Sequence, residues 1–494
     1  MGIVFDITNF GARGDGAHLN TQAIQSAVDE AGRAGGTVYV PAGTFLTGTI
    51  ELRSRVTLEL HPAATLLGSP RIADYRQAAE SIDEDRRPWH LLMAHGAEAV
   101  TVRGGTIDGN GPAFWEPTAG DDPMTVVPAR EDDPARAALT WIRANKAERP
   151  SPMIDFSHCR DVRIADTRIT NGAGWNLHMH CCDRVWIRGV DLDANLLGPN
   201  NDGFDITGCR DVMISDCRLS CCDDAIVLKT TKDSRSVERV TVTNCVLRTR
   251  CAALKLGANE SFHDFRQITF SNCVVYESNR AVGLYSLEGA VIEDLTISNI
   301  VCDTRAPFLF NRPVHLDVRR KRPDARHGAI RNVILSQFVA RTDGRILMTS
   351  EDPDGLDNIV LRDIRLICPV LDDPTPGKDP AVGGTQFSNQ SLEARAAKAA
   401  VVVENARDLV LENISVRWPD GSGTESWNPP LKAANGTTRL FAPAEFRETE
   451  EPPFQFLWAR GLAGGYGRCP GATAAAPGVP LHALENCEGW TWRE

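Results

Sequence analysis

Positive charge is scarce in this chain of 494 residues. Lys and Arg number 53 against 65 Asp and Glu, which gives a formal net charge of −12 at pH 7. Nucleic acids and anionic membrane surfaces are bound by clustered Lys and Arg, so a balance of this sign argues against both. The sequence therefore predicts no nucleic-acid partner and no membrane partner.

Long apolar runs are also missing. No window of 18 uninterrupted apolar residues occurs, which argues against a membrane-spanning helix. The amino end, Met1–Asp6, has neither the basic segment nor the apolar stretch of a signal peptide. Asp6 also stands where a myristoylation signal requires Ser or Thr. We therefore expect a cytoplasmic protein.

The cysteines lack the spacing of a metal site. Without an export signal, 14 cysteines favour free thiols over a disulfide framework. The adjacent pairs Cys181-Cys182 and Cys221-Cys222 differ from the CxxC spacing of zinc sites. Cys217, Cys245 and Cys273 recur every 28 residues, which indicates small apolar side chains stacked in a core. No metal and no cofactor is predicted.

What the sequence does contain is a short phrase that returns along the chain. Two mostly polar residues precede a run of β-branched or apolar residues, and the first five spacings are 23, 27, 28, 28 and 27 residues. The copies are Arg160–Ile164, Asp183–Ile187, Arg210–Ile214, Glu238–Val242, Arg266–Phe270, Glu293–Ile297, Arg331–Leu335, Asp357–Leu361 and Arg407–Leu411. A period in the twenties with strands alone predicts an all-β fold, the parallel β-helix solenoid.

One segment near the start has helical rather than strand periodicity. Residues Asn20–Ala31 combine a capping residue, Asn20, with apolar positions at helical spacing, and Gly35-Gly36 gives a stop. An open end of a β-helix exposes unpaired strand edges. We therefore expect an N-terminal capping helix.

The repeat also predicts where the solenoid ends. The period is broken between Asp372 and Ala399 by Pro, Gly and charge, and again from Trp418 onwards. We predict a β-helix catalytic domain over residues 1–420 and an irregular C-terminal tail, residues 421–494, that wraps it.

Carboxylates gather in two stretches about one coil apart. Asp202 ends Asn200-Asn201-Asp202, and Asp223-Asp224 begins 21 residues later. Positions one period apart in a parallel β-helix stack at about 4.8 Å, so the three carboxylates are expected on one surface. Crowding raises the pKa of at least one of them, which keeps a proton for a leaving group while another carboxylate activates water. Taken alone, an Asp doublet fits a turn or a calcium site equally well.

These stretches and three others resemble glycoside hydrolase family 28, the polygalacturonase and rhamnogalacturonase family of inverting enzymes. The resemblance covers roughly residues 5–420 and includes Asn9–Gly16, Val40–Phe45 and Gly105–Gly111 with Trp115. It implies a right-handed parallel β-helix.

The family's asparagine-x-aspartate falls on Asn200-Asn201-Asp202, and its aspartate doublet falls on Asp223-Asp224. The resemblance implies that Asp223 is the general acid. It implies that Asp202 and Asp224 hold and deprotonate the attacking water, so that the product is inverted at the anomeric carbon. Asn200 belongs to the same substrate-binding motif.

Two further residues are implied near the substrate. The segment Trp175–His178 resembles a strand that borders the family's substrate groove. The resemblance implies that His178 bonds a sugar hydroxyl there. A buried, structural His178 is the alternative. Lys229 follows Asp224 by five residues and resembles a lysine that often follows the doublet.

Two family signatures are missing. Cys251-Ala252-Ala253 stands where glycine-histidine-glycine is usual. Gly283-Leu284-Tyr285 stands where arginine and lysine grip the galacturonate carboxylate, so only Tyr285 offers a polar side chain there. Arg280 and Lys255 are the cations that could replace the pair, and a solvated turn arginine is the alternative for Arg280.

The sequence thus predicts an inverting glycosidase that acts from the chain end on pectic or related plant oligosaccharides, with a neutral sugar preferred to a uronate. Chain-end action is expected because long loops could wall one end of the groove. A polysaccharide lyase and a non-catalytic glycan-binding β-helix are the alternatives. Three clustered acids argue against mere binding, because their mutual repulsion is unfavourable. No pattern in the sequence indicates an oligomeric state.

Overall fold

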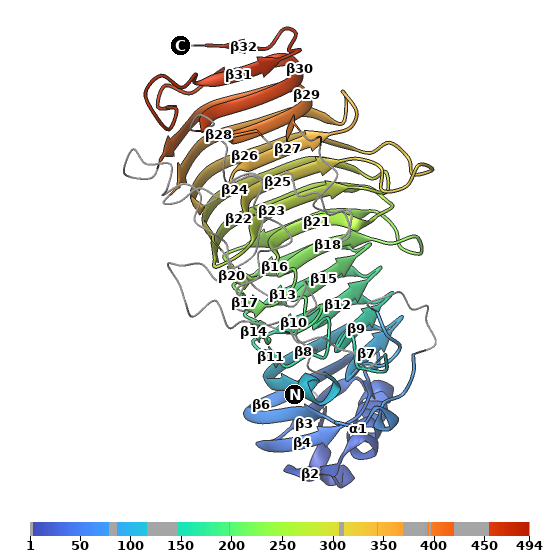
Figure 1. The fold of residues 1–494 in the computed structure, drawn as a ribbon. Coiled ribbons are helices and arrows are strands. Elements are labelled where there is room, and N and C mark those ends of the chain that lie inside the picture. Colours follow the sequence, from blue (N-terminus) through green and yellow to red (C-terminus); the bar gives the residue numbers. More distant parts are fainter. Residues whose placement is uncertain are drawn as a thin grey trace. The chain divides into compact units, whose positions relative to one another are not determined.

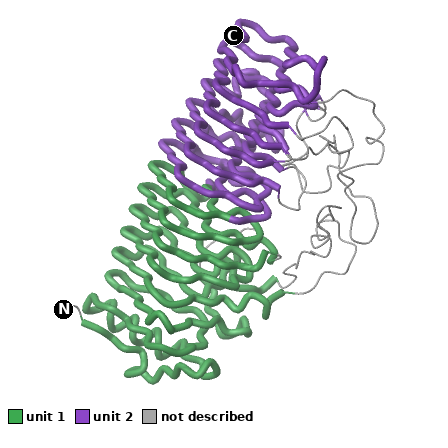
Figure 2. Tube along the Cα trace, turned by 90° about the vertical axis from the view of Figure 1, so that its left-hand side faces the viewer, with its two compact units in different colours: residues 1–118, 142–228, 233–247 green, residues 119–141, 229–232, 248–494 purple. Residues whose placement is uncertain are grey.

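A computed structural model describes residues 3–78, 86–115, 147–196, 198–305, 311–342, 344–368, 391, 393–394, 397–418 and 454–493. Two compact units make up this part of the chain (Figure 2). The first unit contains the described residues up to Leu228 together with Asp233–Leu247. The second unit contains Lys229–Lys232 and the described residues from Arg248 onwards.

Strands dominate both units, and Figure 1 labels most of them along the chain. The strands of the first half are β1 (Ile3–Asp6), β2 (Asp15–Leu19), β3 (Gly36–Val40), β4 (Gly43–Thr47), β5 (Ile50–Glu51), β6 (Val56–Gly68), β7 (Leu92–His95), β8 (Glu98–Asp108), β9 (Ile154–Ser157), β10 (Arg160–Ala165), β11 (Arg168–Thr170), β12 (Leu177–His180), β13 (Asp183–Arg188), β14 (Asp191–Asp193), β15 (Phe204–Thr207), β16 (Arg210–Ser215), β17 (Arg218–Cys221), β18 (Ile226–Thr230), β19 (Val237–Thr243) and β20 (Val246–Thr249). They are followed by β21 (Ala252–Ser261), β22 (Phe265–Tyr276), β23 (Arg280–Ser286), β24 (Val291–Thr304), β25 (Arg312–Val318), β26 (Ala329–Thr342), β27 (Ile346–Ser350), β28 (Leu356–Ile367), β29 (Ala399–Arg417), β30 (Gln455–Arg468), β31 (His482–Glu485) and β32 (Thr491–Trp492). Short 3₁₀ helices lie at η1 (Ile7–Phe10), η2 (Ile72–Asp74) and η3 (Gly111–Phe114).

The recurring phrase forms one strand per coil in each unit, with the register that the sequence predicts. In the first unit Arg160 pairs with Asp183, and Asp183 with Arg210, in parallel strands. In the second unit the parallel series runs through Arg266, Glu293, Arg331, Asp357 and Arg407. The predicted all-β parallel β-helix is confirmed.

The second polar residue of each phrase explains why the phrase recurs. Asp161, Arg184 and Asp211 have φ angles of 56°, 55° and 56°, so each of these residues adopts the left-handed conformation. A β-branched residue at that position would be strained. The following apolar residues are buried, as Val162 and Ile164 show.

The predicted helix is present as α1 (Thr21–Ala34), and Ile24, Ala27, Val28 and Ala31 are its buried residues. It packs against β1, β3 and β5 of the first unit. It ends at Gly35, which has a φ of 71°. Asn20 does not cap it with its side chain, because the Asn20 Oδ1 accepts a hydrogen bond from the Arg13 backbone N–H at 2.7 Å. The covering of the solenoid's end by α1 stays a prediction.

The carboxyl-terminal segment differs from the expected irregular tail. Residues 421–453 lie outside the described residues, but Gln455–Arg468 form β30, which pairs in parallel with β29. Phe456, Leu457 and Ala459 of β30 are buried, so this part of the predicted tail continues the strand pairing.

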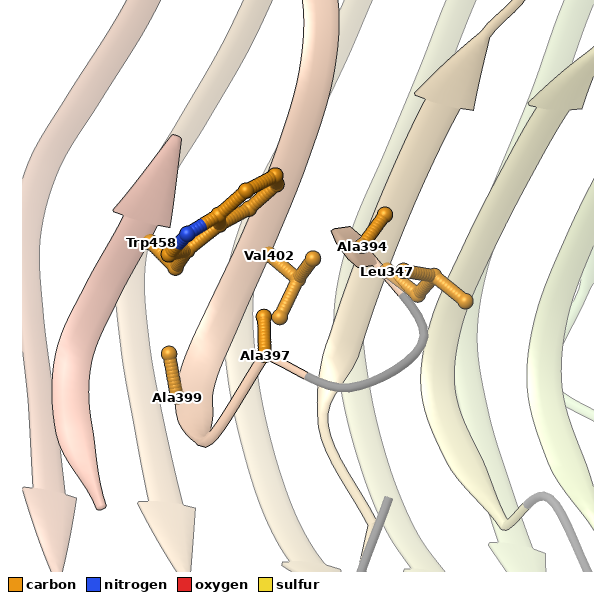
Figure 3. Close-up of a cluster of buried hydrophobic side chains, with 6 residues drawn as sticks. All are labelled: Leu347, Ala394, Ala397, Ala399, Val402 and Trp458. Atoms are coloured by element: carbon orange, nitrogen blue, oxygen red, sulfur yellow. The ribbon is translucent and has the colours of Figure 1, made fainter. Parts of the chain in front are cut away.

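A buried apolar cluster lies on the last strands of the second unit (Figure 3). Leu347, Val402 and Trp458 are partners in register on β27, β29 and β30. Ala394 and Ala397, which precede β29, pack on them. The few described residues between β28 and β29 therefore contribute to the core.

The three cysteines that recur every 28 residues are buried, as predicted for core side chains. Among the described residues, no helix is both long and apolar enough to cross a membrane.

Candidate active site

Asp202 and the Asp223-Asp224 pair lie on neighbouring coils of the first unit. The Gly203 N–H donates to the Asp224 carbonyl at 2.8 Å, and the Phe204 N–H donates to the Ala225 carbonyl at 2.8 Å. A Cβ on Gly203 would lie 2.3 Å from the Ala225 carbonyl oxygen, so the close approach of the two coils requires glycine here. The predicted one-coil offset between the acids is therefore present.

The three carboxylates differ in exposure. Asp202 and Asp224 are 3% and 2% exposed, whereas Asp223 is partly exposed. The Asp223 Oδ1 accepts a hydrogen bond from the Asp224 N–H at 3.0 Å. The arrangement places one acid near solvent beside two that are shielded from it.

Asn200 and Asn201 form the turn that presents Asp202. Asn200 is half-buried and adopts a left-handed φ of 43°. Asn201 is fully buried, and its Nδ2 donates to the carbonyls of Gly172 and Gly174 at 2.8 and 2.9 Å. The same preceding coil also binds Asp202, because the Asn176 side chain donates to the Asp202 carbonyl at 2.7 Å.

His178 is buried, and both of its ring nitrogens have protein partners. Its Nδ1 lies 2.7 Å from Asp155 Oδ1, and its Nε2 lies 3.0 Å from Thr207 Oγ1. Asp155, His178 and Asp205 are partners in register on β9, β12 and β15. This geometry favours the structural alternative for His178 over a direct bond to a sugar.

Arg86 extends this polar row, although no local sequence pattern predicted it. The Arg86 Nη2 donates to Asp155 Oδ2 at 3.0 Å and to Ser157 Oγ at 2.8 Å. Burial by itself would raise the pKa of Asp155, but Arg86, His90 and His178 outweigh it and hold that pKa well below its usual range. Asp155 is therefore an ionised, buried carboxylate.

Neighbouring His180 is held neutral. Burial, helped by His178 and Arg86, lowers the pKa of His180 to about 4. Asp155 and His180 therefore keep opposite states near neutral pH, the first ionised and the second neutral.

The remaining predicted substrate residues belong to the second unit. Lys229, Lys255 and Arg280 are 3%, 6% and 2% exposed, and Tyr285 is 1% exposed. Lys255 is the partner in register of Gly283, so it lies beside the position where the family's basic residues are missing. All four side chains are more buried than solvated turn residues would be.

Tyr285 fills the space over Gly283. A Cβ on Gly283 would lie 2.5 Å from the Tyr285 ring. The Tyr285 hydroxyl accepts from Arg280 Nη1 at 3.2 Å and lies 3.1 Å from His315 Nδ1. Arg280 Nη2 also lies 2.8 Å from Cys251 Sγ. The tyrosine ring therefore packs inside the protein and orients Arg280.

Another buried carboxylate lies on the same strand face as Tyr285, because Asp317 is the partner in register of Tyr285. Asp317 forms an ion pair with Arg319 and accepts a hydrogen bond from Thr349 at 3.0 Å. Burial raises the pKa of Asp317 to about 6 in spite of that pair. The nearby His315 has a pKa well below its usual range because of burial and the charges of Arg312, Arg280 and Arg319.

The described coils and acids agree with the family that the sequence resembles. The family model "Glycosyl hydrolases family 28" matches residues 33–304, more than half of the chain. The chain belongs to this family. The resemblance drawn from the sequence motifs is confirmed.

Curated relatives match part of this family 28 chain. A probable polygalacturonase from Vitis vinifera is 29% identical over 249 residues, which are 47% of the chain and 45% of the relative. An exo-poly-alpha-D-galacturonosidase from Dickeya chrysanthemi is 32% identical over 253 residues, which are 45% of the chain and 41% of the relative. The matched part is less than half the length of either relative.

Solved structures support the fold of this family 28 chain. An exopolygalacturonase from Thermotoga maritima superposes with a TM-score of 0.60 at 21% identity, over 74% of the chain and 87% of that structure. A family 28 exopolygalacturonase from Yersinia enterocolitica superposes with a TM-score of 0.56 at 17% identity, over 87% of the chain and 77% of that structure. At these identities the likeness concerns the fold.

Proposed function

We propose that this protein is an inverting glycoside hydrolase that removes sugar units from the ends of pectic or related plant oligosaccharides. The observation that carries the proposal is the stacking of Asp202 on the Asp223-Asp224 pair, since glycoside hydrolysis needs one carboxylic acid and one carboxylate base within reach of the same bond. Family membership supports the same chemistry.

In the proposed reaction, Asp223 gives its proton to the leaving-group oxygen. Its partial exposure suits contact with a bound sugar. Asp202 and Asp224 hold a water molecule and take its proton as the water attacks the anomeric carbon. Because water attacks directly, without a covalent sugar intermediate, the product has the inverted anomeric configuration.

Chain-end action and a neutral sugar are the finer parts of the proposal. Chain-end action is supported by the names of the Dickeya, Thermotoga and Yersinia proteins, all of which are exo-acting enzymes. Those names refer to galacturonate chains. Preference for a neutral sugar is supported by Gly283-Leu284-Tyr285, because the packed Tyr285 ring supplies no cation.

The test uses galacturonate, neutral and mixed oligosaccharides with the purified chain. Hydrolysis should release new reducing ends, and NMR spectra recorded immediately should show the inverted anomer. A lyase would instead create an unsaturated, ultraviolet-absorbing product and would lose activity in EDTA. If the chain binds an oligosaccharide but releases no new reducing ends from any substrate, the result contradicts the hydrolase proposal and favours a glycan-binding protein.

A further inference from the structure

We propose that Arg86 closes the sugar-binding surface of the first unit on the side of β9, so that only the end of a sugar chain reaches Asp202. The inference rests on the proposed hydrolase function. It assigns the predicted chain-end action to one side chain and its carboxylate partner, Asp155.

The row of residues beside the acids shows where Arg86 lies. Asp155, His178 and Asp205 occupy matching positions on β9, β12 and β15, and Asp205 lies three residues after Asp202. Phe156, which follows Asp155, is a fully buried core residue. Because successive strand residues point to opposite faces, Asp155 and its row point away from the core.

Side chains that point away from the core are normally exposed to solvent, but those of this row are buried. Asp155, His178 and Asp205 are 3%, 2% and 0% exposed. Arg86 binds the Asp155 and Ser157 side chains of this face and is itself only 6% exposed. The guanidinium therefore lies over β9, two coils from β15 or roughly 10 Å at the usual strand spacing.

The residues that follow Arg86 are hydrogen-bonded to the segment before β9, and these bonds fix the position of Arg86 over the strand. The Arg87 N–H donates to the Ser151 carbonyl at 2.6 Å, and the Ser151 N–H donates to the Trp89 carbonyl at 3.1 Å. His90 Nδ1 lies 2.7 Å from the Pro152 carbonyl oxygen. These contacts hold the residues after Arg86 against the coil that leads into β9.

A buried ion pair such as Arg86–Asp155 adds little to the stability of the fold. Desolvation of both charges often makes such a pair no better for stability than apolar side chains of similar volume. The pair does provide a polar, geometrically defined wall. A sugar chain that extends past Asp202 toward β9 would meet Arg86 and could not displace it without breaking its ion pair with the buried Asp155 carboxylate.

The test uses an oligosaccharide that the unaltered chain hydrolyses and the same oligosaccharide carrying a bulky group on its terminal sugar. The unaltered chain should release single terminal sugars and should leave the blocked substrate intact. Arg86→Ala should cleave the blocked substrate at least tenfold faster than the unaltered chain and should release longer fragments.

A double variant guards against misfolding, because Arg86→Ala alone leaves Asp155 without its arginine. Arg86→Ala with Asp155→Asn removes both charges and keeps a polar side chain beside His178. Arg76→Ala is the control, since Arg76 is exposed and pairs with Glu51. It should retain the product pattern of the unaltered chain.

The outcomes separate the two proposals. Cleavage of the blocked substrate by the unaltered chain, or release of single sugars alone by a folded, active double variant, would overturn the role of Arg86 while leaving the hydrolase proposal intact. Absence of hydrolysis by the unaltered chain on every substrate would overturn both.

Discussion

Asp155 in the first unit and Asp317 in the second occupy similar settings, yet their pKa values shift in opposite directions. Both carboxylates are buried, lie on β-helix strands and pair with an arginine. Arg86, His90 and His178 together lower the pKa of Asp155, whereas burial raises that of Asp317 to about 6 although Arg319 is in contact. Glu351 contributes to the rise. For these two buried acids, the neighbouring arginine and histidine side chains, rather than burial alone, decide the direction of the pKa shift.

The two units also differ in the chemistry of their predicted site residues. The first unit holds the three acids, and the second holds Lys229, Lys255 and Arg280. The proposed mechanism therefore predicts a large fall in turnover when one of the acids is replaced and a smaller effect when one of the cations is replaced.

The largest expected effect is that of Asp223→Asn. The amide keeps the shape of the side chain but cannot donate the acid's proton, so turnover should fall about 100-fold to 10,000-fold. Initial rates of reducing-end release measure the effect. Asp317→Asn, a buried aspartate of the second unit, is the control and should retain turnover within tenfold. Activity of Asp223→Asn within tenfold of the unaltered chain would remove Asp223 from the role of acid.

Asp155→Asn should have the next largest effect, on stability. It leaves Arg86 buried without its carboxylate, and breaking a buried pair costs about 3–5 kcal/mol. Because the pKa of Asp155 is lowered on folding, its contribution is present above the unfolded pKa of about 3.9 and is lost only as pH falls through the lower folded value. Urea denaturation should therefore show the same loss at pH 5 and pH 8.

The matched control for that variant is Asp161→Asn. Asp161 pairs with Arg184 on the surface of the same unit, and exposed pairs contribute about 1 kcal/mol or less. Asparagine also tolerates the left-handed φ of 56° at this position. Equal losses from the two variants would contradict a special role for the buried pair.

Asp317→Asn should instead show a pH-dependent effect. A carboxyl whose folded pKa is raised to about 6 stabilises the fold fully below the unfolded pKa, and this stabilisation is lost as pH rises through 6. The unaltered chain should therefore lose about 2 kcal/mol relative to Asp317→Asn between pH 4 and pH 7. Denaturation midpoints for both proteins across this range measure the gap, and a gap that does not change with pH would refute the raised pKa.

The smallest effect concerns substrate charge. Gly283-Leu284-Tyr285 supplies no arginine and no lysine to bind the galacturonate carboxylate. Neutral oligosaccharides should therefore be cleaved about 10-fold to 100-fold better than galacturonate oligomers, which is the effect expected from the loss of one charge-assisted contact. Arg280→Ala should leave this ratio within threefold, because Arg280 is held by Tyr285 and Cys251. The control is Arg248→Ala, since Arg248 is partly exposed and pairs with Glu277. Efficient galacturonate cleavage that collapses in Arg280→Ala but not in the control would show that Arg280 replaces the missing pair.

Local patterns predicted the strands because each coil repeats the same physical requirement. The second residue of each phrase must tolerate a left-handed φ, as at Asp161 and Arg184, and the next residues must fill the core. The one-coil offset between Asp202 and Asp223 followed from the same period. These features depend on residues within about one coil of each other.

Contacts between distant segments could not be predicted in the same way. Arg86 and Asp155 are 69 residues apart, and nothing in the local sequence links them. A usable signal did exist for Asp155, His178 and Asp205, since each lies five residues before the start of a phrase. β30 was missed because its burial pattern, centred on Phe456 and Leu457, lacks the polar pair that begins the phrase.

The spacing between neighbouring coils has a consequence for protein engineering. Asn358 and Asn332 bond across 26 residues, yet Arg407 and Asp357 bond across 50 in the same kind of strand pairing. The chain therefore accommodates about one coil's length of extra sequence between β28 and β29 without a change of register. Since closing a connection costs only about 0.6 kcal/mol for each doubling of its length, a change of length at this junction should cost little stability as long as Ala394 and Ala397 keep their places in the core.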